Sequence, residues 1–371
     1  MRRLEPHVEA ADRARILYIM AANRMCPKAA WALNRDMRLR LKPSVRVQLC
    51  KESLFHYPAL FCTTRILELS MYNAMDVPLS YFPKYLRRWF IVQSEPHACT
   101  TIPDVERIDM LHIGDNSNGE GARQLLEGLL LQRCSVGILR LHADLCTEAA
   151  RPTAFPEGLE TLFMSNTGMG VLQDTGTTDG TATVAVPDSV KDLQLDAYLV
   201  PARVPSALQH LKIMDTENSE HLQYIAEIDG LRTLTLEQCT RTTRMVYPDS
   251  LHSLTIEEST PDESEPSIED IGALPAGLKK LHIKSEYINH PLGELPAALE
   301  ALDLKDSPEF DQPLGKLPEG LKVLHLGPAF TQELGHLPPG LTELMLPMKY
   351  PHPLAVPVGS RMTFTKSAES T

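Results

Sequence analysis

The signature motifs of several common enzyme classes are missing from this 371-residue chain. It contains no Walker A loop, no G-x-G-x-x-G, no H-E-x-x-H and no G-x-S-x-G, which are the motifs of phosphate, dinucleotide, zinc-hydrolase and serine-hydrolase sites. The 13 histidines are scattered, and none forms a close pair with metal-ligand spacing. We therefore predict no catalytic residues, no cofactor and no metal site, and we expect a protein that is not an enzyme.

Cysteine is also scarce, and no long apolar run is present. The seven cysteines are an odd number and include no C-x-x-C pair, which predicts reduced thiols in a cytoplasmic or nuclear protein. No run approaches the roughly 20 apolar residues of a membrane helix, and Ile16–Ala22 is too short and too late for a secretory signal. The arginine-rich start leaves a mitochondrial location as an alternative, although Glu5, Glu9 and Asp12 are acids that a presequence avoids.

Basic residues are fewer than acidic ones, and they are unevenly distributed. The chain has 36 Lys and Arg residues and 48 Asp and Glu residues, so its net charge is −12. This charge argues against general nucleic-acid binding. Residues 1–51 hold 12 Lys or Arg and only 4 acids, a net +8 that leaves −20 for the rest of a chain carrying −12. A basic N-terminal segment on an acidic body indicates two parts with different tasks, and nucleic acid is expected, if at all, only at this basic segment.

What the sequence does contain is a recurring phrase, P-x-x-L-x-x-L-x-L. In four near-perfect copies the prolines follow one another at steps of 21, 22 and 20 residues. A fixed period in this range indicates a solenoid, in which one short unit is stacked many times. The four copies are Leu274–Ile283, Leu295–Leu304, Leu317–Leu326 and Leu337–Leu346.

Weaker copies extend the array towards the N-terminus, starting with Phe82–Ile91 and preceded by an expected strand at Ile66–Asn73. With a mean step of about 21 residues, the array holds about fourteen units. We predict a basic helical N-terminal cap or F-box-like segment at residues 1–57, the repeat array at 58–355, and a C-terminal cap or tail at 356–371.

The chemistry of the phrase predicts the fold. L-x-L alternation places both leucines on one face of a short strand, and proline, which lacks a backbone donor, suits the segment before the strand. The expected fold class is an α/β repeat: a leucine-rich-repeat solenoid with a parallel concave β-sheet and a mostly irregular convex side. One longer convex connection, Glu120–Gln132, is expected to be helical, with Leu125, Leu126, Leu129 and Leu130 on one face.

A second phrase lies between the copies and carries a family resemblance. It appears at Tyr287–Pro296, Phe310–Pro318 and Phe330–Pro338. A sequence close to F-[N/D/T]-Q-P-L therefore follows each expected strand. The combined unit resembles the FNIP repeat, a variant of the leucine-rich repeat. The Asn of common leucine-rich repeats is replaced at Glu286, Ser307, Ala329 and Lys349, and the aromatics Phe310, Phe330 and Tyr350 are expected to fill the turn instead. The resemblance implies a binding scaffold and no reaction.

The N-terminal segment is open to more than one interpretation. Val8–Asn23 and Lys28–Leu41 have the spacing of two helices interrupted by Pro27. They could form a cap over the first exposed leucines, which solenoids need. Their layout is also similar to an F-box, which FNIP-family proteins often carry and which docks on a Skp-type linker of a cullin ubiquitin ligase, although the usual L-P-x-E opening is absent. A third alternative is contact between the arginines and acidic protein or RNA.

We conclude from the sequence that the chain is a non-enzymatic protein–protein interaction scaffold, a subunit of a larger assembly whose partner is another protein. The alternative is an F-box-like substrate receptor of a cullin-type ubiquitin ligase. Parallel strands would align the residue between the two leucines of each copy on the concave face, where a partner could bind. These candidate partner-binding residues are Phe90, Phe163, Gln194, Lys212, Thr235, Thr255, His282, Asp303, His325 and Met345.

Overall fold

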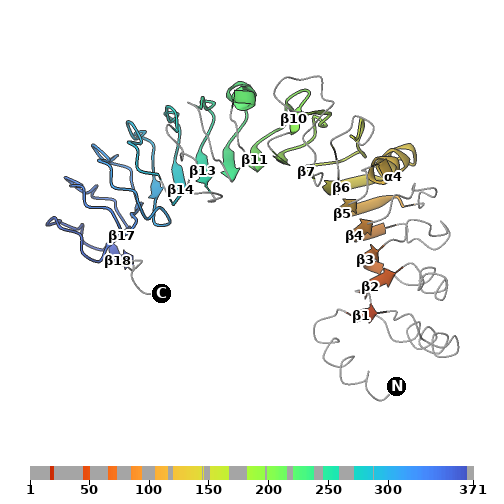
Figure 1. Cartoon of the computed structure of the whole chain (residues 1–371), viewed down its shortest axis with the longest axis horizontal. Helices are drawn as coiled ribbons and strands as arrows, with labels where there is room; N and C mark the ends of the chain where they lie inside the picture. Colours follow the sequence, from red (N-terminus) through yellow and green to blue (C-terminus); the bar gives the residue numbers. More distant parts are fainter. Residues whose placement is uncertain are drawn as a thin grey trace, which may run out of the picture. The chain divides into compact units, whose positions relative to one another are not determined.

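The computed structural model shows a mostly parallel β-sheet with few helices (Figure 1). The structure describes residues 17–20, 45–50, 66–72, 85–93, 105–115, 120–143, 145, 151–166, 182–196, 199–214, 220–237, 245–258, 271–286 and 288–365. The chain divides into two compact units. Unit 1 comprises Met1–Val190 and Pro201–Pro205, and unit 2 comprises Lys191–Val200 and Ser206–Thr371.

In unit 1, each strand from β1 to β7 pairs in parallel with the next strand along the chain. A 12-residue helix, α4 (Glu120–Leu131), connects β5 to β6, and β8 (Ala182–Val184) is a further short strand. The paired strands are β1 (Leu17–Met20), β2 (Val45–Cys50), β3 (Ile66–Tyr72), β4 (Tyr85–Gln93), β5 (Arg107–Asp115), β6 (Ser135–Ala143) and β7 (Thr161–Asn166).

Unit 2 repeats the same arrangement with shorter strands. Its paired strands, from β9 to β18 without β10, form one parallel ladder in which each strand pairs with the next. A short 3₁₀ helix, η4 (Glu220–Glu227), precedes β12, and β10 (Leu199–Pro201) has three residues. The paired strands are β9 (Asp192–Asp196), β11 (His210–Met214), β12 (Thr233–Glu237), β13 (Ser253–Glu257), β14 (Lys280–Lys284), β15 (Ala301–Asp303), β16 (Val323–His325), β17 (Glu343–Pro347) and β18 (Arg361–Thr365).

The L-x-L core of each copy forms a strand with one buried face, as the alternation predicts. In β14, Leu281 and Ile283 are buried while His282 between them is partly exposed. The connecting loops lie on one side of the strands (Figure 1). We call the opposite side of the sheet, where the residues between the leucines lie, the open face.

The proline of the phrase begins a tight turn before each strand. The Leu278 N–H donates a hydrogen bond to the Pro275 carbonyl (3.0 Å), and the Leu321 N–H does the same to Pro318 (3.1 Å). Proline tolerates this position because only its carbonyl is needed there. The phrase therefore combines a turn with the strand that follows it.

The second phrase forms ladders on the loop side of unit 2. Phe310 and Phe330 are buried and stacked, with ring centroids 6.3 Å apart, and Tyr350 continues the stack at 6.2 Å. The prediction that Phe310 and Phe330 fill the turn is confirmed, whereas Tyr350 is only partly buried. The polar residue after Phe310 also bonds to the next copy, because the Asp311 carboxylate accepts from the Thr331 N–H at 2.7 Å.

The helix expected over Glu120–Gln132 is confirmed as α4, which buries Leu125, Leu126 and Leu129. Cys134 follows it as a free, buried thiol whose pKa burial raises to about 12, so this thiol stays protonated. Within the described ranges, no helix is both long and apolar enough to cross a membrane.

The ends of the array differ from the expectation. The helix predicted over Val8–Asn23 is wrong at Leu17–Met20, which form β1 and pair in parallel with β2. Pairing within a sheet can override the helix preference of a short segment. The second predicted helix, Lys28–Leu41, lies outside the described residues. At the other end, Arg361–Thr365 form β18 within the segment expected to be a cap or tail.

Candidate interaction surface

In unit 2, the strand register aligns the predicted partner-binding residues in one row across the open face. Lys212 lies opposite both Gln194 and Thr235, and Asp303 lies opposite both His282 and His325. Adjacent strands are about 4.8 Å apart, so neighbouring members of the row are within contact distance of a single bound segment. All eight are partly exposed: Gln194, Lys212, Thr235, Thr255, His282, Asp303, His325 and Met345.

In unit 1, the predicted residues Phe90 and Phe163 belong to a corresponding row, but they are not adjacent. Phe90 lies opposite His112, His112 opposite Arg140, and Arg140 opposite Phe163. His112 and Arg140 were not among the sequence candidates. The signal was present, since each stands between the two apolar residues of an L-x-L core, but the copies around them lack a clear proline and leucine frame.

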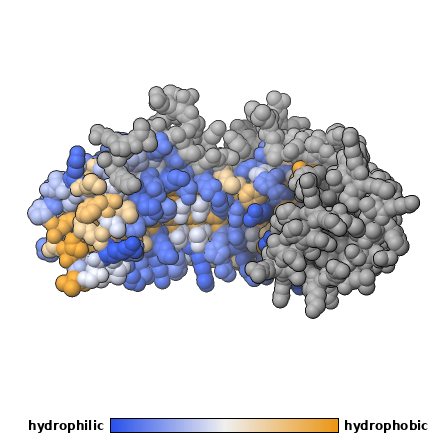
Figure 2. Space-filling view, turned by 90° about the horizontal axis from the view of Figure 1, so that it is seen from below, coloured by the Kyte–Doolittle hydropathy of each residue, from blue (hydrophilic) through white to orange (hydrophobic). Residues whose placement is uncertain are grey.

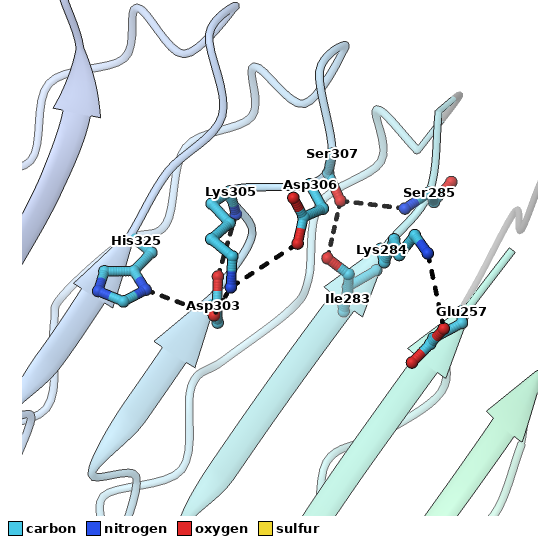
Figure 3. Close-up of polar contacts among 9 residues, drawn as sticks. All are labelled: Glu257, Ile283, Lys284, Ser285, Asp303, Lys305, Asp306, Ser307 and His325. Atoms are coloured by element: carbon cyan, nitrogen blue, oxygen red, sulfur yellow. Dashed lines mark hydrogen bonds and ion pairs between the residues drawn. The ribbon is translucent and has the colours of Figure 1, made fainter. Parts of the chain in front are cut away.

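The polar part of the unit 2 row is most closely packed around His325 (Figure 3). Its side chain is only 16% exposed, with Nδ1 3.4 Å from the Asp303 carboxylate and Nε2 3.6 Å from that of Glu343. The Nε2 atom of His282 and the Nδ1 atom of His325 are buried without a hydrogen-bond partner.

Lysines neutralise most of the carboxylates on this part of unit 2. Lys305 Nζ is 2.8 Å from Asp303 and 3.7 Å from Asp306, and Lys284 is 3.8 Å from Glu257. Burial raises the pKa of the Asp303 carboxyl, but hydrogen bonds from Lys305 outweigh that effect and hold the pKa below its usual value. The acids and bases of this region are therefore largely paired with one another.

Two serines that sequence reasoning did not single out for bonding hold the loops after β14 and β15 (Figure 3). The buried Ser307 hydroxyl donates to the Ile283 carbonyl (2.9 Å) and accepts from the Ser285 N–H (3.3 Å). Ser285 in turn donates to Glu258. At position 307, serine thus bonds the buried backbone of the preceding copy at the end of β14.

An open groove of about 530 Å³ follows the ends of these strands and leads to an apolar end of unit 2. Met362 and Phe364 of β18 occupy the positions that Leu344 and Leu346 fill in β17. They are 39% and 51% exposed because no described strand covers β18. Figure 2 shows this end as an apolar patch on an otherwise mostly hydrophilic visible surface. The groove is lined by Glu258, Lys284, Glu286, Lys305, Asp306, Pro308, Pro328, Met345, Phe364 and Thr365.

Unit 1 carries a different feature, a row of rings in contact. The ring centroids are 5.7 Å apart for Phe90 and His112, 5.1 Å for His112 and His142, and 4.7 Å for His142 and Phe163. Burial is the main cause that lowers the pKa of both histidines, and the nearby charge of Arg140 lowers each further. Both rings are therefore neutral near neutral pH. His142 Nδ1 also shares a hydrogen bond with the Ser165 hydroxyl.

The two recurring histidines of unit 2, His282 and His325, lie on strands that are not neighbours. His282 and His325 are on β14 and β16, with Asp303 of β15 between them. Over the ranges that the structure describes, no group of three or more His, Cys, Asp or Glu side chains could hold a metal ion.

Comparison with known proteins adds no assignment. No protein-family model matches the chain, and no curated protein matches it. The rows of residues on the open faces of the two units are therefore the features from which a function can be argued.

Proposed function

We propose that this chain is a leucine-rich-repeat solenoid of the FNIP type that acts as a non-enzymatic protein–protein interaction scaffold, as a subunit of a larger assembly. The single observation that carries the proposal is the alignment of the eight open-face residues of unit 2 in register across eight parallel strands. Stacked repeats offer extended surfaces of this kind to macromolecular partners. A cytoplasmic or nuclear location is part of the same proposal.

The distribution of polar groups supports a protein partner rather than a small molecule. The row combines hydroxyls at Thr235 and Thr255 with the partly buried His282 and His325, and Met345 lies at its end. Protein interfaces mix apolar contacts with about one hydrogen bond per 100–200 Å². An open row of residues across eight strands also suits an extended or folded partner better than a compact ligand, which prefers an enclosed cavity.

Site-specific photo-crosslinking tests this proposal. A photoreactive phenylalanine analogue at Thr255, on the open face, should crosslink to another protein in cells. The same analogue at His336, an exposed residue before the β17 copy on the loop side, is the matched control. Crosslinks that form at His336 and not at Thr255 would place the interaction on the loop side and contradict the proposal.

The second proposal is the ubiquitin-ligase substrate receptor. The feature that supports it is the spacing of Lys28–Leu41, which resembles part of an F-box, whereas Leu17–Met20 of the same layout form strand β1. Such a receptor would bind a Skp-type linker through its N-terminal segment and its substrate through the repeats. Affinity purification of the full chain and of a chain lacking residues 1–55 separates the two proposals. Ligase components that remain bound after the deletion would exclude the receptor.

A further inference from the structure

On four strands of unit 1, β4 to β7, the open face differs in charge from that of unit 2. Strands β4 to β7 each place three residues on this face, and the register aligns them in three rows of four. None of these twelve positions is Asp or Glu, although the chain has 48 acids and a net charge of −12. We call this set the basic-aromatic face; the residues that define it are Arg88, Phe90, His112, Arg140, His142 and Phe163.

The corresponding face of unit 2 has a different pattern. There Glu237, Glu257 and Asp303 lie on the open side, and each contacts a lysine. On the basic-aromatic face, no described carboxylate pairs with Arg140, which is exposed. Asp109 of β5 precedes the aligned positions and is already paired with Arg107 at 3.0 Å. An anionic group brought to Arg140 would therefore not displace an existing internal ion pair.

The apolar part of the face is pre-organised. The rings from Phe90 to Phe163 contact one another at 4.7–5.7 Å, so they lose little conformational freedom when a partner binds. Five of the twelve positions are Phe, Val, Met or Ile, and all five are only partly buried. A partner that matched this surface would bring apolar or aromatic side chains as well as negative charge.

We propose that the basic-aromatic face is a docking site for an acidic protein segment that also carries apolar or aromatic side chains. Its carboxylates would pair with Arg140, and its apolar side chains would pack on the ring row. This inference rests on the proposed function, because it names the chemistry of one partner of the scaffold.

Single-stranded RNA is the competing occupant, since bases stack on aromatic rings and phosphates attract arginine. The structure favours protein. Only two of the twelve positions are permanent cations, whereas nucleic-acid sites neutralise many phosphates. The net charge of −12 would repel a polyanion, while a short acidic segment meets only the local field.

The test begins with selection of binders from a library of random 12-residue peptides displayed on phage, using the full-length protein as bait. We expect the selected peptides to be enriched in Asp and Glu and in Phe, Tyr, Leu or Met relative to the unselected library. Selected peptides without acidic enrichment would overturn the inference.

The strongest selected peptide is then labelled, and its affinity is measured by fluorescence anisotropy. Arg140→Glu should weaken binding by about tenfold or more, since it replaces an attraction by a like-charge contact. Arg203→Glu is the matched control, because Arg203 is an exposed arginine of unit 1 away from these strands, and the affinity should not change. Equal affinity of wild type and Arg140→Glu would overturn the docking site.

Further variants and an RNA probe separate the basic-aromatic face from the unit 2 row and a peptide from RNA. Phe163→Ala should also weaken binding, which keeps the test decisive if Arg140→Glu fails to fold. A labelled 20-nucleotide single-stranded RNA should bind more weakly than the peptide, and tighter RNA binding would overturn the proposal. Peptides whose binding is lost with Thr255→Arg in unit 2 and kept with Arg140→Glu would overturn this inference while supporting the proposed scaffold.

Discussion

At the scale of single residues, the two histidines of the ring row link the open face to stability in acid. Burial holds the pKa of His112 and His142 below the ordinary value of 6.5. As the pH falls below 6.5, the unfolded chain therefore binds protons that the folded chain does not, and the free energy of unfolding decreases. Above that pH both states are neutral and the effect vanishes.

We therefore expect acidification to destabilise the wild type more than a double variant, His112→Gln with His142→Gln. The melting temperature of each protein, measured at about pH 7.5 and about pH 5, provides the comparison. The melting temperature of the double variant should fall less between the two pH values than that of the wild type. An equal loss would show that these side chains are as well solvated in the folded state as in the unfolded chain.

Glycine has a steric role at one position of unit 2 and none at another. A Cβ atom at Gly327 would overlap the carbonyl oxygen of Ser307, whereas a Cβ at Gly340 would meet no atom within 4 Å. Gly327→Ala should lower the free energy of unfolding by about 1–3 kcal/mol, because backbone must move to accept the methyl group. Gly340→Ala should be neutral or slightly stabilising. Urea titration measures both, and similar values for the two would contradict the packing around Gly327.

At the scale of elements, the aromatic ladder on the loop side ties successive copies of unit 2 together. Phe330 is fully buried and stacks between Phe310 and Tyr350. Phe330→Ala should cost about 3–5 kcal/mol, since it leaves a cavity and removes both ring contacts. Phe330→Leu retains most of the volume and should cost less than half as much. Chemical denaturation checks both variants, and equal costs would mean that the volume retained by leucine contributes nothing and that loss of the ring contacts accounts for the whole cost.

The repeated strands were predictable because one local pattern determines each of them. A proline turn followed by L-x-L specifies a short strand with one buried face, and β14 to β17 follow that rule closely. The same reasoning was wrong at Leu17–Met20, where a short apolar run suits a helix as well as a strand. Only the partner strand Val45–Cys50 distinguishes the two, and pairing is not visible in a local pattern.

The candidate surface was predictable to a similar degree. The position between the two leucines is fixed by alternation, so the unit 2 row could be named from sequence. The ring contacts of His112 and His142 could not be predicted, because those two rings meet diagonally between neighbouring strands. Such contacts depend on side-chain rotamers and on the register at Gly114, which lies opposite His142.

At the scale of the whole molecule, the division into two units was not visible in the period. The copies Val186–Leu195 and Val204–Ile213 carry the same phrase, yet each crosses a boundary between the units, after Val190 and after Pro205 respectively. A repeat pattern shows which turn and strand each copy forms, and each strand contacts only the neighbouring strands. The cooperativity of unfolding along such a chain depends on how strongly adjacent copies interact. The sequence pattern of one strand does not determine that interaction.

Leu324→Ala tests how far a local defect spreads. Leu324 is fully buried in β16, and its truncation should cost about 2–5 kcal/mol. Because stabilising contacts run between adjacent copies, we expect amide exchange to accelerate in β15, β16 and β17 while β4 to β6 of unit 1 remain protected. Hydrogen–deuterium exchange read by mass spectrometry measures this. The reciprocal variant, Leu139→Ala in β6, should show the opposite pattern. Acceleration spread evenly over both units in either variant would mean that the chain unfolds as one cooperative block, and the division into two units would then have no energetic counterpart.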